Sequence, residues 1–355
     1  MYFEIDRTSH ANWQWNETPP ELKDGDVALD LEAFAFTANN ISYAVAGDML
    51  DYWGFFPANA PWGRVPVMGY GRVVESRNAD IEVGGRYFGF YPMTDRHIVA
   101  AENSSSGFRD IAPYRANHAS VYRSFDLQPS EASAEPDTDH RTLLLRGLFI
   151  TSWLVDDFLA DSDMFGANQV LITSASSKTS IALAHSLRRR GQTTAVGLTS
   201  ERNRAFVEGL GLYDAVVLYD DLDALDHRAP SVIVDMAGNQ TLKADLHARL
   251  ADLRYSCSVG ATHRENLDDA GEIAAPAPEF FFAPTQIQKR SQEWGAEILN
   301  ERMGAALEEF VADAERWMTV AVSAGRDAVA ELYMSTLAGE VSPAVGQIGV
   351  LTAAE

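Results

Sequence analysis

The stretch from residue 169 to residue 219 limits the possible folds of this chain more than any other part of the sequence. It contains three short apolar runs separated by two helix patterns, at residues 170–172, 181–190, 195–198, 204–210 and 215–219. The first helix pattern ends in three arginines followed by Gly191, which are typical signals of a helix C-terminus. Strands that alternate with helices over such short connections pair in parallel through right-handed crossovers. Because sheets of this kind bind ligands beyond the carboxyl ends of their strands, the turn 174–179 is the first candidate site.

The alternating pattern continues beyond residue 219. A fourth buried run at 231–237 is followed by a helix pattern at 242–253 and a fifth apolar run at 254–259. A long apolar helix pattern at 142–160 leads into the first strand. Five strands with their crossovers predict a doubly wound parallel sheet of ordinary domain size.

The two ends of the chain have different patterns. Up to about residue 123, short apolar runs are broken by Gly, Pro, Asn and Asp, which predicts a small barrel or sandwich with one helix-like interruption at 39–46. Residues 127–140 are rich in Pro, Ser and acidic residues and predict a solvated loop or linker. Towards the C-terminus the pattern predicts two helices, at about 286–320 and 325–337, and a final strand at 346–351.

Composition excludes several classes of protein. The 355 residues suffice for two domains, and no apolar run is long enough to span a bilayer. The first residues lack the basic start and apolar core of a secretory signal, so we expect a cytoplasmic protein with no membrane contact. The only cysteine, Cys257, leaves no internal disulfide. A net charge of −23 argues against nucleic acid as a partner, because nucleic acid requires a basic face.

The order of elements and five local motifs resemble the medium-chain dehydrogenase/reductase superfamily over essentially the whole chain. The motifs are VGGRYFGF at 83–90, QVLITSASS at 169–177, LTSERNRAFVEGLGLYDAVVLYD at 198–220, VDMAGN at 234–239 and YSCSVGA at 255–261. They are most similar to the zinc-independent quinone-oxidoreductase and enoyl-reductase branch, and within it to a subgroup described only as a domain of unknown function. The resemblance implies a GroES-like β-rich substrate domain at 1–125, a Rossmann-like dinucleotide-binding domain at 126–275, and a return segment at 276–355 that completes the catalytic domain. A homodimer is usual for such proteins.

The candidate phosphate turn lacks the glycines that related reductases carry. Glycine lets the backbone approach a pyrophosphate and lets the helix pack on the strand. Serine is among the next smallest residues, and a hydroxyl or a helix N-terminus can itself hold a phosphate, with a lysine adding positive charge. The candidate phosphate-binding residues are therefore Ser174, Ser176, Ser177, Lys178 and Thr179. The alternative is that these residues only turn the chain and cap the helix.

The end of the second strand indicates which dinucleotide is bound. NAD-specific domains place an acidic residue there, whereas NADP requires a cation and small hydrogen-bond donors. Thr199, Ser200, Arg202 and Asn203 suit a 2′-phosphate, and Glu201 points the other way. We therefore expect NADPH as the cofactor, although these residues would also fit the solvated first turn of a helix.

A catalytic zinc site is not expected. Zinc-dependent members of the superfamily use a cysteine and a His-Glu pair in the N-terminal domain, and this chain has no cysteine before Cys257. Its eight histidines are dispersed without ligand spacing, and we expect most of them on the surface. We expect Cys257, within a buried strand, to serve packing rather than nucleophilic chemistry.

The resemblance places the substrate between the two domains, against the segment 37–56. Asn40, Tyr43 and Tyr52 are the candidates for holding or protonating a developing oxyanion, because a neutral tyrosine hydroxyl donates at pH 7 and a cationic cofactor can lower its pKa. The alternative is that the aromatic residues of this segment are core residues. From the second domain, the residues expected near the nicotinamide ribose or the pocket wall are Gly238, Asn239, Val259, Gly260 and Phe281 or Phe282.

These expectations combine into one function with two alternatives. The sequence predicts a zinc-independent, NADPH-dependent oxidoreductase that transfers hydride to a conjugated alkene, quinone or carbonyl, with an apolar or acyl-type small molecule as substrate. The first alternative is a degenerate reductase fold that binds a nucleotide as a sensor without turnover. The second is a scaffold protein that contacts its partners through the acidic loop at 131–139.

Overall fold

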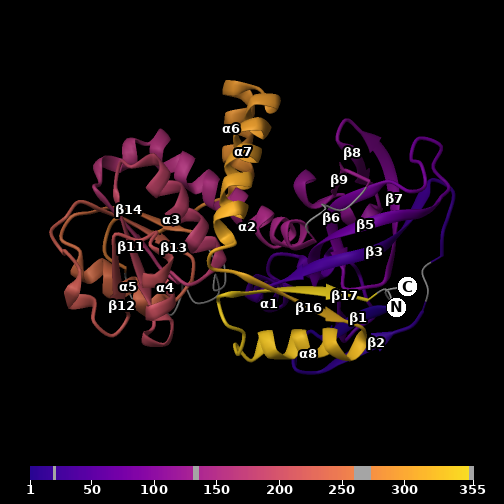
Figure 1. Cartoon of the computed structure of the whole chain (residues 1–355), viewed down its shortest axis with the longest axis horizontal. Helices are drawn as coiled ribbons and strands as arrows, with labels where there is room; N and C mark the ends of the chain where they lie inside the picture. Colours follow the sequence, from indigo (N-terminus) through magenta and orange to yellow (C-terminus); the bar gives the residue numbers. More distant parts are fainter. Residues whose placement is uncertain (19–20, 131–135, 260–272, 352–355) are drawn as a thin grey trace. The chain divides into compact units, whose positions relative to one another are not determined.

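A computed structural model describes residues 1–18, 21–130, 136–259 and 273–351. The chain forms two compact units, Met1–Leu144 with Met318–Glu355 (unit 1) and Leu145–Trp317 (unit 2) (Figure 1). The expected boundaries, near residues 125 and 275, lie elsewhere: the first division falls inside helix α2 (Pro136–Asp161), and residues 276–317 cluster with unit 2. Ion pairs explain the second difference, because Arg290 binds both Asp157 and Asp161 of α2.

Unit 2 contains the alternating strands and helices that the sequence predicts. Its described strands form one parallel sheet in the order β12-β11-β10-β13-β14-β15. The strands are β10 (Gln169–Ile172), β11 (Thr194–Thr199), β12 (Ala215–Leu218), β13 (Ser231–Asp235), β14 (Leu253–Ser258) and β15 (Glu279–Phe280). The first five were predicted, and the two-residue β15 was not. The order reverses between β10 and β13, which is the switch point where doubly wound sheets bind ligands.

Three helices of unit 2 are the predicted crossovers, namely α3 (Lys178–Arg190), α4 (Arg204–Leu210) and α5 (Gln240–Arg249). The unit also contains η4 (Asp163–Gly166), η5 (Glu201–Asn203), η6 (Leu222–Ala224), α6 (Ala283–Trp294) and α7 (Ala296–Ala314). The single helix expected at 286–320 is wrong. Gly295, with φ +87°, ends α6 and begins α7, and residues 319–324 form a strand instead.

Unit 1 contains a closed barrel. The strands β3, β5, β6, β9, β8 and β7 pair in this order, and β7 pairs back onto β3. Strand β17 extends the sheet from β3, β16 is parallel to β17, and a separate small sheet has the order β2-β1-β4. The strands are β1 (Tyr2–Asp6), β2 (Trp13–Asn16), β3 (Asp26–Phe36), β4 (Trp62–Gly63), β5 (Pro66–Ser76), β6 (Arg86–Pro92), β7 (Arg96–Ser104), β8 (Gly107–Asp110), β9 (Ser124–Gln128), β16 (Thr319–Ala324) and β17 (Val345–Val350). A Rossmann-type doubly wound sheet plus a GroES-like β-rich domain, the predicted fold class, is thereby confirmed.

Short helices connect the strands of unit 1. They are α1 (Ala38–Val45), η1 (Tyr52–Gly54), η2 (Pro113–Arg115), η3 (Ser120–Tyr122) and α8 (Arg326–Leu337). The loop expected at 127–140 is shorter than predicted, because β9 runs to Gln128 and α2 begins at Pro136. Proline at the start and Asp137 and Asp139 in the first turn are favourable at a helix N-terminus. Residues 131–135, which belong to the acidic loop of the scaffold alternative, lie outside the described residues.

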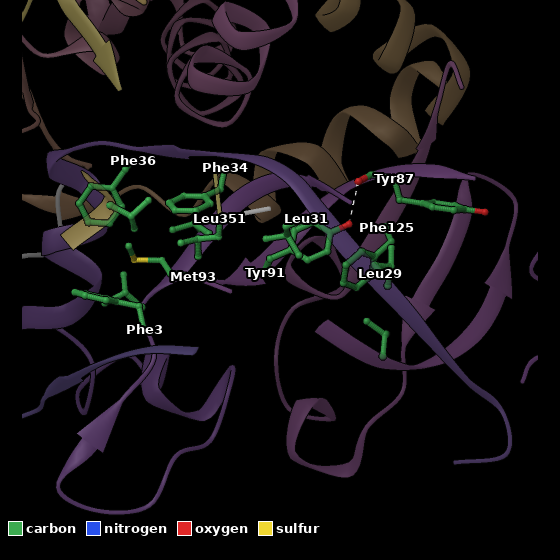
Figure 2. Packing of buried hydrophobic residues seen from close by; sticks show 14 of the residues in the cluster. Phe3, Leu29, Leu31, Phe34, Phe36, Tyr87, Tyr91, Met93, Phe125 and Leu351 are labelled. Atoms are coloured by element: carbon green, nitrogen blue, oxygen red, sulfur yellow. Dashed lines mark hydrogen bonds between the residues drawn. The ribbon is translucent and has the colours of Figure 1, made fainter. Parts of the chain in front are cut away.

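The core of unit 1 joins the barrel to the two ends of the chain. Phe3 and Leu351 pack in the same cluster as Leu29, Phe34 and Tyr91 (Figure 2). Most of this core is apolar, and the hydroxyl of the fully buried Tyr91 donates to the carbonyl of Tyr87 at 2.9 Å. A buried hydroxyl with its hydrogen bond made costs little, so the aromatic side chain can serve the core.

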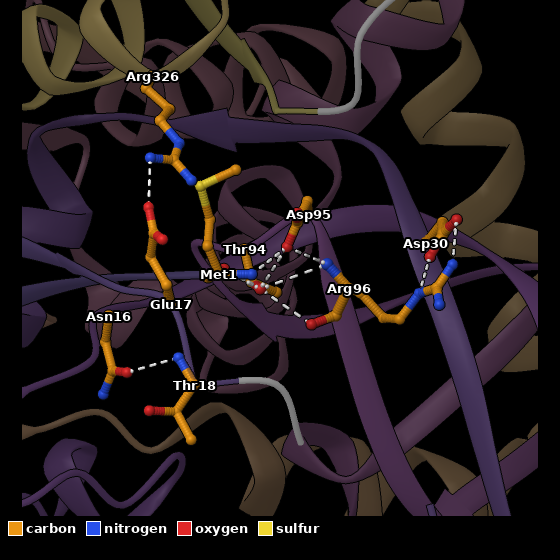
Figure 3. A network of polar contacts seen from close by, with 9 residues as sticks. All are labelled: Met1, Asn16, Glu17, Thr18, Asp30, Thr94, Asp95, Arg96 and Arg326. Atoms are coloured by element: carbon orange, nitrogen blue, oxygen red, sulfur yellow. Dashed lines mark hydrogen bonds and ion pairs between the residues drawn. The ribbon is translucent and has the colours of Figure 1, made fainter. Parts of the chain in front are cut away.

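Polar contacts fix the first residues of the chain onto unit 1. The amino group of Met1 pairs with Asp95, and Arg96 pairs with Asp30 of β3 (Figure 3). Arg326, at the start of α8, lies 2.6 Å from Glu17. Exposed ion pairs contribute little to stability individually, so these contacts orient segments more than they stabilise the fold.

None of the helices in the described ranges has the length and apolar character needed to cross a membrane.

Candidate functional site

A cavity of about 720 Å³ lies at the switch point of the parallel sheet in unit 2. It is lined by the turns that follow β10, β12 and β13 and by the first turns of α5, namely by Ser174, Tyr219, Ala237, Gly238, Asn239, Gln240, Thr241, Leu242 and Asp245. The carboxyl ends of parallel strands and a helix N-terminus are where doubly wound folds hold anionic and nucleotide ligands. The cavity therefore has the position expected of a dinucleotide site.

The turn after β10 is shaped by hydroxyl groups. Ser174 has φ +51°, an unusual conformation for a residue other than glycine, and its backbone N–H donates to the hydroxyl of Tyr219 at 2.9 Å. Ser177 is the N-cap of α3, and its hydroxyl accepts from the N–H of Ser180. Both the expected cap and the expected turn are thus present. Ser174 is the member of this turn that lines the cavity.

Close packing beneath the turn is achieved by a glycine on the neighbouring strand. Ala175 is fully buried, and a Cβ built on Gly197 of β11 would lie only 2.9 Å from the Cβ of Ala175 and 2.8 Å from the ring of Tyr213. The hydroxyl of Tyr213 donates to the carbonyl of Ala175 at 2.8 Å. A side chain at position 197 would collide with the turn, so the missing Cβ of Gly197 is what permits this close approach of the turn to β11.

Two residues at the start of α3 were predicted to bind phosphate. Lys178 is half-buried, and burial lowers its pKa to about 8. The carbonyl of Thr179 accepts from the hydroxyl of Ser152 on α2 at 2.7 Å, which ties the first turn of α3 to that helix. Lys178 thus adds a cationic side chain at the N-terminus of α3. The positive end of the helix dipole lies there too, and both charges favour an anionic ligand.

The residues after β11 lie at the next strand end. Thr199 is buried, Ser200 and Asn203 are half-buried, and Arg202 is exposed together with Glu201. Asn203 donates from Nδ2 to the hydroxyl of Ser176 at 3.0 Å, so the two predicted binding segments are in direct contact. These residues are not part of the cavity lining, and their contact with a 2′-phosphate remains a prediction.

The turn after β13 brings two further predicted residues to the cavity. Gly238 has φ +70°, and the side chain of Asn239 caps α5 by accepting from the N–H of Leu242 at 3.1 Å. Both line the cavity beside Ser174. Val259 is half-buried after β14, Gly260 lies outside the described residues, and the Phe282 side chain is 49% exposed. Phe281 is instead buried against the ring of Phe158.

The candidate residues of unit 1 form a compact aromatic group. Asn40 is part of a capping box: its Oδ1 accepts from the N–H of Thr37, and its Nδ2 donates to the carbonyl of Pro66 at 2.9 Å. Both ends of the Asn40 amide are therefore used in hydrogen bonds that stabilise the fold, and a catalytic role is not needed to explain this residue. The rings of Tyr43 and Tyr52 lie 4.4 Å apart, and burial raises the pKa of both hydroxyls rather than lowering it. Both tyrosines therefore stay neutral at physiological pH.

The histidines differ from expectation. His97, His185 and His247 are buried, and in each of them burial lowers the pKa. These three are exceptions to the expected surface positions, because dispersed spacing says nothing about burial, and the other four described histidines, His10, His118, His140 and His227, are half-buried. Within the described ranges, no three His, Cys, Asp or Glu side chains lie close enough to hold a metal ion. Cys257 is fully buried in β14 and burial raises its pKa, which confirms its role in packing.

Sequence reasoning missed several residues that shape the cavity. Tyr219 was interpreted as the end of a strand, although it immediately follows β12 at the carboxyl edge of the sheet and closes the motif at 198–220. Asp245, in α5, lines the cavity. Lys243, two residues earlier in the same helix, forms a buried ion pair with Asp235. The position of Tyr219 at the end of a predicted strand could have indicated a place at the site. No pattern in the sequence indicates that Asp235 pairs with Lys243.

Solved structures share this fold. The quinone oxidoreductase from Coxiella burnetii matches with a TM-score of 0.59 and 13% identity, covering 99% of each chain. CurA from Vibrio vulnificus in complex with NADPH matches with a TM-score of 0.57 and 10% identity, covering 97% of this chain and 94% of the other. The yhdH oxidoreductase from Salmonella enterica in complex with NADP has a TM-score of 0.52 and 12% identity, over 96% and 95% of the two chains. No curated protein matches the chain.

A family model matches residues 34–342, which is most of the chain, and carries the description "Protein of unknown function (DUF2855)". Likeness to quinone oxidoreductases and enoyl reductases establishes the medium-chain dehydrogenase/reductase fold, as the sequence motifs predict. The chain therefore belongs to the DUF2855 family, whose fold in this protein is that of the medium-chain dehydrogenase/reductase superfamily.

Proposed function

We propose that this protein is an NADPH-dependent oxidoreductase that transfers hydride, without a metal ion, to a conjugated alkene, quinone or carbonyl. The observation that carries the proposal is the cavity at the switch point, where Ser174, Tyr219 and the turn before α5 meet. Two structures of the same fold are complexes with NADPH or NADP. An apolar or acyl-type small molecule as substrate, a homodimer and a cytoplasmic location are parts of the same proposal.

The residues around the cavity fit a dinucleotide. The close approach of Ala175 to Gly197 holds the turn against β11. The N–H groups of Ser174, Ala175 and Ser177 already donate within the protein, so a pyrophosphate would be held mainly by side-chain hydroxyls and the N-terminus of α3. Lys178 and the N-terminus of α3 supply positive potential. When bound, the nicotinamide would supply the hydride. Asn203, in contact with Ser176, and the exposed Arg202 would hold the 2′-phosphate.

Unit 1 would supply the group that stabilises the reduced substrate. We assign this role to Tyr43 or Tyr52, because a neutral tyrosine hydroxyl can donate to a developing oxyanion, and burial, which raises the pKa of both, keeps them neutral. Asn39 already donates to the hydroxyl of Tyr43 at 2.7 Å, which leaves the hydroxyl proton of Tyr43 available to another acceptor. Asn40 is the weakest of the three catalytic candidates because its amide serves the cap of α1.

The test measures binding and turnover separately. Fluorescence titration with NADPH gives the affinity, and the loss of nicotinamide absorbance across a panel of enones and quinones gives turnover. Lys178→Ala and Arg202→Ala should each weaken NADPH binding, by about tenfold for a charge-assisted phosphate contact. Arg228→Ala is the matched control, since Arg228 is exposed and precedes β13 at the opposite, amino edge of the sheet. Unchanged affinity in both site variants would contradict the proposed phosphate contacts.

Turnover then distinguishes the enzyme from a sensor. Tyr43→Phe and Tyr52→Phe remove one hydroxyl each and should leave NADPH affinity unchanged, because the cavity belongs to unit 2. Loss of one oxyanion donor lowers kcat by about a hundredfold, so at least one of the two variants should show that loss. NADPH binding with no oxidation on any substrate would favour the sensor, for which the altered serine turn is the supporting feature. Stability that is indifferent to both NADPH and NADH would favour the scaffold.

A further inference from the structure

A buried ion pair joins the two ends of the turn that lines the cavity. Asp235 is the last residue of β13, Lys243 lies on α5, and their side chains are 2% and 5% exposed. The Nζ of Lys243 lies 2.9 Å from Oδ2 of Asp235 and donates to the hydroxyl of Ser258 at 3.0 Å. Charged groups are rarely buried to this degree unless they are paired, so Lys243 is what allows the carboxylate to remain inside.

The second oxygen of the carboxylate organises the turn. Oδ1 of Asp235 accepts from the hydroxyl of Thr173 at 2.8 Å and from the backbone N–H groups of Ala237 and Gly238 at 3.1 Å each. The hydroxyl oxygen of Thr173 accepts in turn from the N–H of Met236 at 2.8 Å. The carboxylate thus links the end of β10 to the turn after β13, on the two strands that flank the switch point.

A contribution to stability alone does not account for this arrangement. Replacing a buried ion pair by apolar residues of similar size is often neutral or stabilising, because the pair must be removed from water. An apolar pair, however, would leave the N–H of Gly238 without its acceptor, and the N–H of Ala237 with only the hydroxyl of Thr173 at 3.2 Å. Ala237, Gly238 and Asn239 all line the cavity, so the acceptor controls the shape of the candidate binding surface.

We propose that Asp235 is a positioning residue of the cofactor site: its Oδ1 fixes the turn 236–239 in the shape that lines the cavity, with Lys243 as its charge partner. This proposal rests on the proposed function for the identity of the ligand. It does not rest on it for the geometry, since the hydrogen bonds exist in the protein without a ligand. Asp235 touches the turn rather than the ligand, so it is not a catalytic residue.

Two double variants separate the acceptor from the charge. Asp235→Asn with Lys243→Met removes both charges but keeps an Oδ1 acceptor, whereas Asp235→Leu with Lys243→Met removes the charges and the acceptor together. We expect the Asn variant to bind NADPH within about threefold of the wild type, and the Leu variant to bind about tenfold more weakly or worse, since small misplacements of positioning groups have effects of this order. The midpoint of thermal unfolding checks that both variants are folded.

Hydrogen exchange of the ligand-free protein provides a readout that does not depend on NADPH. The amide of Gly238 should exchange at least about tenfold faster in the Leu variant than in the Asn variant, and that of Ala237, which keeps the hydroxyl of Thr173, by less. Amides in the last turn of α5 serve as the control and should not change. Equal exchange and equal affinity in the two variants would overturn the proposal. If the wild type does not bind NADPH, the proposed function fails, but the exchange comparison still decides whether Asp235 holds the turn.

Discussion

His97 should make unit 1 sensitive to acid. Its side chain is 5% exposed, and neither ring nitrogen has a hydrogen-bond partner among the described residues. Burial, with the nearby positive charge of Arg115 second, lowers its pKa from 6.5 to about 3. The rings of Phe56 and Tyr91 lie 5.2 Å and 6.3 Å away, so its surroundings suit a neutral aromatic ring.

The sign and size of the effect follow from linkage. Between pH 6.5 and pH 3 the unfolded chain carries a proton on His97 that the folded protein does not, so the free energy of unfolding decreases as the pH falls. Each pH unit in this window costs about 1.4 kcal/mol, which gives about 2 kcal/mol between pH 6.5 and pH 5. In His97→Phe this contribution is absent, and the free energy of unfolding should fall by about 2 kcal/mol less over the same interval.

Hydrogen exchange measures this difference in unit 1 itself. The opening free energies of the amides in β7 and β3, corrected for intrinsic exchange rates at pH 7 and pH 5, should decrease more in the wild type than in His97→Phe. Amides of β10 and β13 in unit 2 serve as the internal control, because they belong to the other compact unit. If the two proteins lose the same free energy within about 0.5 kcal/mol, the unpaired buried imidazole is not the cause of acid sensitivity.

Three further outcomes are expected. The affinity for NADPH should fall by about tenfold from pH 7 to pH 9, because Lys178, with a pKa lowered to about 8, loses its charge over this range; titrations with Lys178→Met should show a flatter profile, and parallel profiles would contradict the assignment. Gly197→Ala should cost about 1–3 kcal/mol of unfolding free energy through its contacts with Ala175 and Tyr213, and adding Ala175→Gly should recover part of the loss in denaturant titrations. Cys257, fully buried with a raised pKa, should react with a thiol reagent only after unfolding, so fast labelling of the native protein would contradict its placement.

The sequence contained most of the fold because the relevant signals are local. Five strands of unit 2 and the end of α3 follow from apolar runs, arginines and Gly191 that lie within a few residues of one another. Strand β16 was missed because its short run, TVAVSA, extends a helical pattern, and it becomes a strand only by pairing with β17 some 25 residues later. The closure of the barrel by β3 and β7 likewise depends on pairing between distant residues.

The candidate site was partly predictable for the same reason. Ser174, Gly238 and Asn239 follow predicted strands, and the carboxyl ends of those strands meet at one edge of the sheet. The contact of Tyr219 with Ser174 spans 45 residues, and the pairing of Asp235 with Lys243 depends on how α5 lies against β13. No periodicity in the sequence reports such contacts, because each is decided by tertiary packing.

The serine turn also illustrates how the geometry of a candidate phosphate turn can depend on residues outside a contiguous motif. What the turn requires physically is a backbone that can approach a phosphate and a helix that can approach its neighbouring strand. The close approach of helix and strand needs a glycine on only one side of the contact. Here the glycine is Gly197 on the strand, opposite Ala175 in the turn. The left-handed conformation of Ser174, in which glycine would be favoured, is held by its hydrogen bond to Tyr219. The features that shape this turn therefore lie partly outside it, at Gly197 of β11 and at Tyr219 just after β12, and a search confined to residues 173–180 would not find them.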